Sequence, residues 1–348
     1  MTGYDHTNPG STYTNATAGI SQMGGAIQGK ALSLSTVVTT LAGGSEGTAD
    51  GTGTSAEFNE PQGITTDGTN LYVTDHKNHT IRKIVISTGV TTTFAGAGGG
   101  VFYYPTGITT DGTNLYVADR NNHRIRKIVI SSGAVTTLAG SSAGTADGTG
   151  TSAQFNKPNG ITTDGTNLYT VSWTNNTVRK IVISTGEVST LAGTAGTSGN
   201  TDATGTSARF SWPFGITTDG TNLYIAEVNT RSIRKVVISS GVVTTFAGSP
   251  SGSVSGGSTD ATGTSARFSN PDAITSDGTN LYVADTQNHR IRKIVISSGV
   301  VTTLAGSGSG NTDATGTSAR FSRPQGITTD GTNLYVTDWL NHTIRKIE

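Results

Sequence analysis

The stretch GITTDGTNLY, residues 63–72, decides the fold of this 348-residue chain. Five further copies begin at Gly107, Gly160, Gly215, Ala273 (as AITSDGTNLY) and Gly326. The tyrosines that end the six copies are Tyr72, Tyr116, Tyr169, Tyr224, Tyr282 and Tyr335. Their spacing of 44 to 58 residues is that of a small all-β structural unit repeated along the chain.

Each repeat predicts four β-strands. GITTD is followed by an Asp-Gly pair, as at Asp67-Gly68, which is a strong signal of a tight hairpin turn. NLYVTD or NLYVAD supplies the second strand, IRKIVIS the third, and VVTTLAG the fourth, after a turn such as Thr88-Gly89. A longer loop containing Phe-x-x-Pro, first at Phe58 and Pro61, leads to the next repeat. Radial repetition of such sheets predicts an all-β, six-bladed β-propeller of four-stranded antiparallel blades.

The last repeat has only three strands, and a matching fourth strand lies near the other end of the chain. The sequence ends in NHTIRKIE, residues 341–348, whereas STVVTTLAG, residues 35–43, precedes the first complete repeat. We therefore predict that the N-terminal strand pairs with the C-terminal blade and closes the ring, which leaves no open seam. Donation of this strand by a neighbouring molecule is the alternative. The predicted domains are an N-terminal arm, residues 1–34, and a propeller, residues 35–348.

The composition argues against several classes of partner. The 23 basic and 23 acidic residues give a net charge of zero, which disfavours nucleic acid or an anionic membrane surface as a ligand. No stretch approaches the roughly 20 apolar residues of a membrane span. The absence of cysteine excludes disulfides and thiolate chemistry. The start, MTGYDHTNPG, has neither the basic nor the apolar region of a secretory signal.

The second and third strands of the repeat resemble those of NHL-repeat propellers. The words NLYVAD…NHRIRKI carry the resemblance, most clearly at Asn114–Ile128 and Asn280–Ile294. The likeness extends over about residues 35–348. It implies the propeller fold but leaves the function open, because this fold hosts lyases, hydrolases, binding modules and scaffolds.

An Asp and a His recur four residues apart before the third strand. The pairs are Asp75/His79, Asp119/His123, Asp285/His289 and Asp338/His342. Such a pair could bind a metal or act in acid–base catalysis. We favour a structural interpretation in which the pair braces the loop between the second and third strands by hydrogen bonding. A catalytic site on a propeller needs distinct residues that converge on the axis, and one residue copied around the ring does not provide them.

Two other repeated charges also receive a structural interpretation. The long loops carry Asp50, Asp147, Asp202, Asp260 and Asp313. A calcium site usually gathers several carboxylates, so an Asx-type turn is the better explanation of these single aspartates. The Arg-Lys pair of the third strand, first at Arg82-Lys83, predicts ion pairs between blades. We predict no metal, no cofactor and no catalytic residue.

One end of the predicted propeller varies between blades. Antiparallel order places the DGTN turns at one end and the loops between second and third strands at the other. The variable end holds the candidate binding residues Tyr103, Tyr104, Trp173, Trp212, Phe214, Glu227, Arg231 and Trp339. Aromatic side chains among Gly, Ser and Asn loops suit recognition of a glycan or peptide. Glu227 and Arg231 are singular charges that replace the Asp/His pair, and they could form an ion pair.

The arm suggests a second role. Its apolar candidates for assembly contacts are Tyr4, Tyr13, Ile20, Met23, Ile27, Leu32 and Leu34. An extended arm can add a strand to a neighbour and build a polymer. The favoured expectation is therefore a non-enzymatic structural or interaction protein, extracellular or on the cell surface, that self-assembles into an oligomer or filament. The alternatives are a glycan- or peptide-binding module and, third, a metal-dependent lyase or hydrolase.

Overall fold

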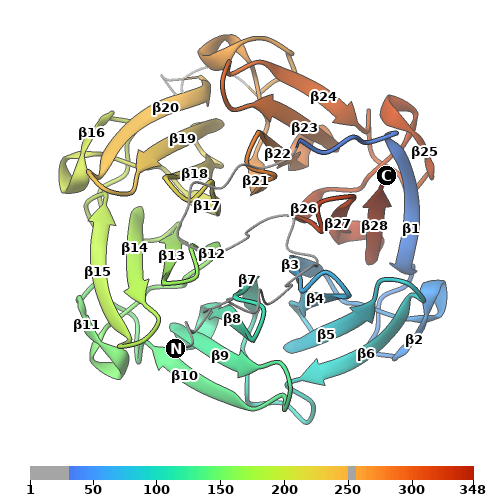
Figure 1. Ribbon diagram of the computed structural model, residues 1–348, viewed down its shortest axis with the longest axis horizontal. Helices are drawn as coiled ribbons and strands as arrows, with labels where there is room; N and C mark the ends of the chain where they lie inside the picture. Colours follow the sequence, from blue (N-terminus) through green and yellow to red (C-terminus); the bar gives the residue numbers. More distant parts are fainter. Residues whose placement is uncertain (1–30, 250–255) are drawn as a thin grey trace, which may run out of the picture.

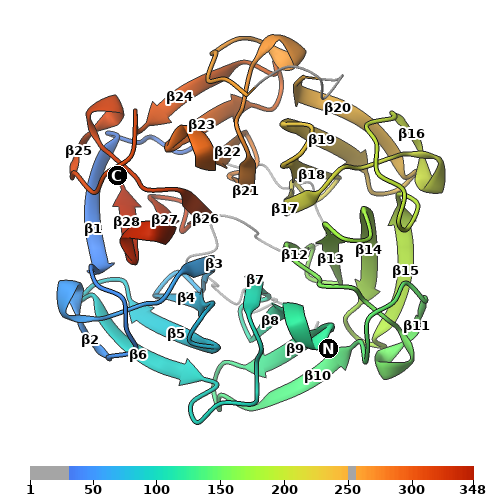
Figure 2. The same ribbon diagram turned by 180° about the vertical axis from the view of Figure 1, so that it is seen from behind.

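Six antiparallel sheets are arranged radially around one axis in the computed structural model of this chain (Figures 1 and 2). The structure describes residues 31–249 and 256–348. Each sheet is one blade, and we number blades 1 to 6 by their innermost strands in chain order. The predicted all-β six-bladed propeller is confirmed.

The innermost strands are β3 (Pro61–Thr66), β7 (Pro105–Thr110), β12 (Ile161–Thr163), β17 (Pro213–Thr218), β21 (Pro271–Ser276) and β26 (Pro324–Thr329). The second strands are β4 (Asn70–Asp75), β8 (Asn114–Asp119), β13 (Asn167–Ser172), β18 (Asn222–Glu227), β22 (Asn280–Asp285) and β27 (Leu334–Asp338). The third strands are β5 (Thr80–Val85), β9 (Arg124–Val129), β14 (Thr177–Val182), β19 (Ser232–Val237), β23 (Arg290–Val295) and β28 (Thr343–Ile347).

The outer strands are β6 (Val90–Ala95), β10 (Val135–Ala139), β15 (Glu187–Ala192), β20 (Val242–Gly248), β24 (Val301–Ala305) and β1 (Val37–Gly43). Short 3-10 helices lie in the connections: η1 (Gly53–Ser55), η2 (Arg120–Asn122), η3 (Gly150–Ser152), η4 (Gly205–Ser207), η5 (Gly263–Ser265), η6 (Thr286–Asn288), η7 (Gly316–Ser318) and η8 (Trp339–Asn341). In the described ranges, no helix has the length and apolar character needed to cross a membrane.

The repeated DGTN turn is held by its aspartate. In blade 1, Gly68 has a φ of 88°, a conformation that favours glycine, and Asp67 Oδ1 accepts a hydrogen bond from the backbone N–H of Asn70 at 2.7 Å. Asp67 Oδ2 accepts the hydroxyl of Tyr72 at 3.0 Å. The same tyrosine–aspartate bond is present in all six blades at 2.7–3.0 Å. Local turn chemistry therefore explains why this word recurs.

The ring is closed by the N-terminal strand, as predicted. β1 pairs antiparallel with β28, with Val38 opposite Ile347 and Thr40 opposite Arg345. The backbone N–H of Glu348 also donates to the carbonyl of Val37 at 3.0 Å. Figure 1 shows β1 beside β28, so the two ends of the propeller sequence lie in one sheet. Blade 6 is therefore completed within the chain.

The sequence predicts four strands in each blade, but four of the blades have a fifth strand. These two-residue strands are β2 (Gly51–Thr52), β11 (Gly148–Thr149), β16 (Ala203–Thr204) and β25 (Ala314–Thr315). Each pairs with the outer strand of its blade, as β2 does with β6. The long loop before each innermost strand thus folds back on the rim and covers the sheet edge, which would otherwise be open to pairing.

The hydrophobic core of the described residues consists of six clusters, one between each pair of neighbouring blades. Between blades 3 and 4, for example, buried Tyr169 and Val171 pack with Phe210, Leu223 and Ile225. Burial of these side chains holds each blade to the next.

The described part of the arm packs on its own propeller. Leu32 is buried in the cluster between blades 5 and 6, Leu34 packs against that cluster, and the backbone N–H of Leu32 donates to Asp277 Oδ2 at 3.0 Å. Figure 1 shows this segment crossing blade 5 before it enters β1. The other candidate assembly residues, Tyr4, Tyr13, Ile20, Met23 and Ile27, lie outside the described residues.

Candidate binding face and channel mouth

We call one end of the propeller the loop face. It consists of the loops between the second and third strands and of the segments that lead into the innermost strands. Figure 2 looks onto this face. Twelve of the thirteen non-glycine residues with positive φ in the described ranges lie here, two per blade. They are Glu60, His79, Tyr104, His123, Lys157, Asn176, Trp212, Arg231, Asn270, His289, Arg323 and His342. Such uncommon backbone conformations concentrate on this face.

The repeated histidine joins each blade to the next one. His79 Nδ1 accepts a hydrogen bond from the backbone N–H of Tyr104 at 3.0 Å. The same bond recurs at three other junctions, Lys157 to His123, Arg323 to His289 and Glu60 to His342, at 3.1–3.3 Å. In blade 3 the side-chain carbonyl of Asn176 takes the same role for Trp212, at 3.0 Å. The histidine therefore does not act on its own loop, as we had expected, but on the neighbouring blade.

The repeated aspartate braces the loop and binds an arginine. Asp75 accepts hydrogen bonds from the backbone N–H of Asn59 at 2.7 Å, from Asn78 Nδ2 at 2.9 Å and from Arg82 Nη1 at 3.0 Å. Arg82 Nη2 also binds Asp50 Oδ1 at 2.9 Å. Both carboxylates belong to blade 1, so the expectation of ion pairs between blades is wrong. The loop aspartates, such as Asp50, form ion pairs with the arginine of the third strand, so the expectation of an Asx-type turn at these residues is wrong.

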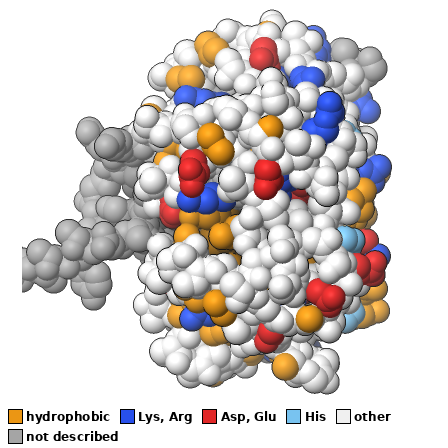
Figure 3. Space-filling view, turned by 90° about the vertical axis from the view of Figure 1, so that its right-hand side faces the viewer, with side chains coloured by type: hydrophobic (Ala, Val, Ile, Leu, Met, Phe, Trp, Pro, Cys, Tyr) orange, Lys and Arg blue, Asp and Glu red, His pale blue; other side chains and the backbone are white. Residues whose placement is uncertain are grey.

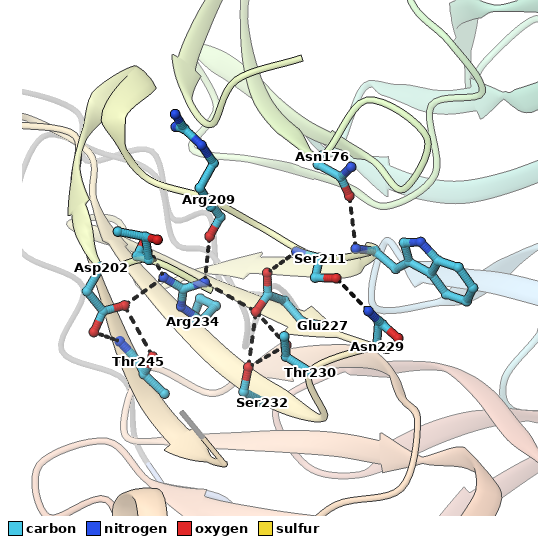
Figure 4. Close-up of polar contacts among 12 residues, drawn as sticks. Asn176, Asp202, Arg209, Ser211, Glu227, Asn229, Thr230, Ser232, Arg234 and Thr245 are labelled. Atoms are coloured by element: carbon cyan, nitrogen blue, oxygen red, sulfur yellow. Dashed lines mark hydrogen bonds and ion pairs between the residues drawn. The ribbon is translucent and has the colours of Figure 1, made fainter. Parts of the chain in front are cut away.

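Glu227 replaces the aspartate in blade 4 and lies at the centre of a buried network (Figure 4). Its carboxylate accepts hydrogen bonds from the backbone N–H of Ser211 at 2.7 Å and from the hydroxyls of Thr230 and Ser232 at 2.7 and 3.0 Å. It pairs with Arg234 at 3.3 Å, and burial raises its pKa. Glu227 is fully buried, so it does not belong to the exposed loop face.

Tyr103 and Tyr104 stand against the histidines of blade 1. Tyr103 is 49% exposed, and its ring centroid lies 5.0 Å from that of Tyr104. Tyr104 contacts His79 at 4.6 Å and His76 at 4.9 Å between centroids. His76 Nδ1 donates to the carbonyl of Pro105 at 3.0 Å. Burial lowers the pKa of His76 to about 4, so this imidazole is neutral at physiological pH.

A second aromatic group spans blades 2 to 4. The guanidinium of Arg120 lies 5.0 Å from the ring centroid of Trp173, and Trp173 meets Trp212 edge-on at 5.8 Å. Trp212 is 45% exposed. On blade 6, the guanidinium of Arg323 lies 5.9 Å from the ring centroid of Trp339. Figure 3 views the disc from its side, and hydrophobic and histidine side chains, with acidic and basic ones among them, lie along the face at the right of the view.

The residue after the proline of each Phe-x-x-Pro motif differs between blades. These residues are Gln62, Thr106, Asn159, Phe214, Asp272 and Gln325, and we call them the channel-mouth ring. They lie at the loop-face ends of the innermost strands, which surround the axis of the propeller (Figure 2). All except Phe214 are buried.

Neighbouring members of the channel-mouth ring are in contact. Asn159 Nδ2 donates to the carbonyl of Phe214 at 3.2 Å, and Gln325 Nε2 donates to Asp272 Oδ2 at 3.4 Å. The next residue is glycine in five blades, and a Cβ on Gly63 would overlap the carbonyl oxygen of Thr106 in the next blade. The innermost backbones of neighbouring blades therefore touch at this level.

Sequence reasoning found Phe214 in this ring and missed the other five residues. The signal was present as the variable position in PQGI, PTGI, PNGI, PFGI, PDAI and PQGI. Polar residues at one variable position do not stand out until the six innermost strands are known to converge. Arg231 occupies the loop position that histidine holds in other blades, with a φ of 58°. Within the described residues, no group of three or more His, Asp or Glu side chains could hold a metal ion.

Comparison with known proteins agrees with this architecture. The NHL repeat family matches residues 102–128, from Phe102 to the third strand of blade 2. The chain is 25% identical over 323 residues to human NHL repeat-containing protein 2, covering 88% of this chain and 41% of that protein. The chain thus spans less than half the length of this curated relative.

Solved structures share the fold at low sequence identity. An auxiliary nutrient binding protein from Bacteroides thetaiotaomicron has a TM-score of 0.69 at 22% identity, covering 90% of this chain and 76% of that one. Virginiamycin B lyase from Staphylococcus aureus has a TM-score of 0.53 at 17% identity, covering 83% and 94%. At these identities the likeness shows the fold alone.

The six radial sheets and the closing N-terminal strand define a six-bladed β-propeller. Its blade 2 matches the NHL repeat, and the chain is similar over most of its length to an NHL repeat-containing protein.

Proposed function

We propose that this propeller is a non-enzymatic binding module that takes a glycan on its loop face. The observation that carries the proposal is the contrast between its two ends. The DGTN turns are the same in every blade, whereas the loop face presents aromatic side chains that occur in single blades, with Tyr103 and Trp212 the most exposed. The uniform repeats form a rigid scaffold, and the residues that vary on one face form a specific binding surface on it.

The chemistry of this surface suits a glycan. Exposed aromatic rings offer apolar faces, and the side-chain amides of the channel-mouth ring offer hydrogen-bonding groups for hydroxyls. The Bacteroides neighbour with this fold is described as a nutrient binding protein, which is consistent with such a role. A peptide ligand is the alternative outcome, and an extracellular or cell-surface location fits either ligand.

The test compares the two exposed aromatics with an exposed residue elsewhere. The double variant Tyr103→Ala/Trp212→Ala should lose retention on a glycan array by about tenfold or more, because each ring contributes contact area. Val300→Ala, an exposed apolar residue before the outer strand of blade 5, should leave binding unchanged. The melting temperature should stay constant in both variants. Equal glycan retention by the double variant and the parent would refute the proposal.

Self-assembly through the arm stays a prediction. Leu32 and Leu34 pack on their own propeller, and the remaining candidates lie outside the described residues. Light scattering of the full chain and of a variant lacking residues 1–30 measures this directly. A monomeric full-length protein at high concentration would contradict self-assembly.

A further inference from the structure

Asp272 differs from the other buried acids at the loop-face ends of the strands. Five buried carboxylates in the described ranges each have an arginine Nη within 2.9–3.3 Å: Asp75, Asp119, Glu227, Asp285 and Asp338. Asp272 is 7% exposed and forms no ion pair with any described residue. Its carboxylate accepts a hydrogen bond from the amide of Gln325 instead, whereas the nearby hydroxyl of Thr286 donates to the carbonyl of Pro324 at 2.6 Å. A buried carboxylate without a cation is costly, so this site has an unmet charge.

The same ring holds hydrogen-bond acceptors without donors. Gln62 Oε1, Gln325 Oε1 and Asn159 Oδ1 are buried, and none of these three oxygens has a hydrogen-bond partner in the described structure. All three belong to the channel-mouth ring, and Gln325 is adjacent to Asp272. Buried polar atoms are normally paired, so these oxygens indicate a donor that the described residues do not supply. The ring therefore presents one negative charge and several acceptors to a ligand.

We propose that the channel-mouth ring binds a protonated primary amine of the ligand, with Asp272 as its counter-charge and the amide oxygens of Gln325 and Gln62 as acceptors. This rests on the proposed function and specifies its ligand class, an amine-bearing glycan. An ammonium group carries one positive charge and three N–H donors, which matches one carboxylate and its neighbouring oxygens. A calcium ion takes six to eight oxygens, usually from several carboxylates, and the ring provides only one.

The surroundings of Asp272 make this recognition dependent on pH. The charged groups that act on it are Asp285 at the end of β22 and Arg323 before β26. The pKa of Asp272 is raised to about 7, because burial and the charge of Asp285 outweigh the lowering by Thr286, Gln325 and Arg323. Amine binding requires the ionised carboxylate. Affinity should therefore increase from pH 5.5 to pH 8, where an alkyl amine with a pKa near 10 stays protonated.

The experiment uses calorimetric titration of the full chain with 2-aminoethyl β-glucoside and with its N-acetylated form, which lacks the charge. We expect the amine to bind at least about tenfold more tightly than the amide. Asp272→Asn should remove this preference and its pH dependence, and Gln325→Leu should weaken amine binding. Glu187→Gln, which removes a carboxylate from the exposed outer strand β15, is the matched control and should behave as the parent.

Three outcomes would overturn the inference. Equal affinity for the two glucosides, with binding still lost in the Tyr103/Trp212 double variant, would support glycan binding by the loop face and refute the amine site. Full amine binding by Asp272→Asn would show that another group anchors the ligand. Displacement of the amine by millimolar sodium, potassium or calcium chloride, at constant ionic strength, would assign the ring to a metal ion.

Discussion

Arg292→Met removes the guanidinium that links two carboxylates inside blade 5. Arg292 is fully buried, and its Nη1 binds Asp285 Oδ2 and the carbonyl of Arg267, both at 2.9 Å. Its Nη2 binds Asp260 Oδ1 at 2.6 Å and the carbonyl of Thr259 at 3.1 Å. Methionine fills much of the same space, so the expected effect comes from lost charge and hydrogen bonds, with a small packing contribution.

The loss in free energy of unfolding depends on how deeply each carboxylate that loses its arginine partner is buried. Asp260 is about half exposed, so its share of the ion pair is at most about 1 kcal/mol. Asp285 is buried, and breaking a buried pair costs about 3–5 kcal/mol. We therefore expect Arg292→Met to lower the free energy of unfolding by about 3–5 kcal/mol at pH 8.

The effect should depend on pH in a defined direction. Burial raises the pKa of Asp285 to about 6 even with Arg292 present, and the arginine charge is one of the influences that lower it. Without the arginine, the pKa in the folded protein rises further above the unfolded value. The carboxyl then binds a proton at pH 5, which relieves the unpaired charge, so the loss of stability should be smaller at pH 5 than at pH 8.

Urea unfolding followed by circular dichroism at both pH values measures the effect. Lys293→Met is the matched control, because Lys293 is the next residue of β23 and is partly exposed. The control should change the free energy of unfolding by less than about 0.5 kcal/mol. A loss of stability at pH 8 as small as that of the control would show that the ion pairs of Arg292 do not hold the blade together.

Two further predictions concern single residues of the loop face. His289→Ala leaves the backbone N–H of Arg323 without its acceptor and should lower the free energy of unfolding, measured by thermal denaturation, by about 1–3 kcal/mol. His289→Asn imitates Asn176 of blade 3 and should lower it by less than about 1 kcal/mol. Equal losses in both variants would contradict the role of His289 at the blade junction. Asp272 has a pKa of about 7 in the folded protein against 3.8 in the unfolded chain, so the parent loses stability as the pH rises from 4 to 7. Asp272→Asn should therefore be more stable than the parent by up to about 4 kcal/mol above pH 7 and nearly equal to it at pH 4. A stability difference that does not change with pH would contradict the buried charge.

The fold could be predicted from sequence because its determinants are local and repeated six times. The DGTN turn depends on hydrogen bonds within one hairpin, such as those of Asp67 with Asn70 and Tyr72. Each repeat therefore carries its own strand and turn signals. Closure of the ring also followed, because residues 35–43 match the strand that the last repeat lacks.

The candidate site could be predicted only in part. Aromatic residues such as Tyr103 and Trp212 stood out because they interrupt a regular repeat. The sequence did not indicate which of the candidate residues are buried. Glu227 was predicted to lie on the variable face because its charge occurs in one blade only, but it is buried in blade 4, where it contacts Ser211, Thr230 and Arg234. A charge on a strand end is compatible with either position until its hydrogen-bond partners are known.

The sequence by itself determined the number of blades, the order of strands and the strand that closes the ring, because these follow from short-range turn chemistry and from repetition. Only the tertiary structure decided that the histidines join neighbouring blades, that arginines pair within their own blade, and that Gln62, Asp272 and Gln325 belong to one ring. These contacts connect residues far apart in the chain, and only radial packing of the blades brings them together.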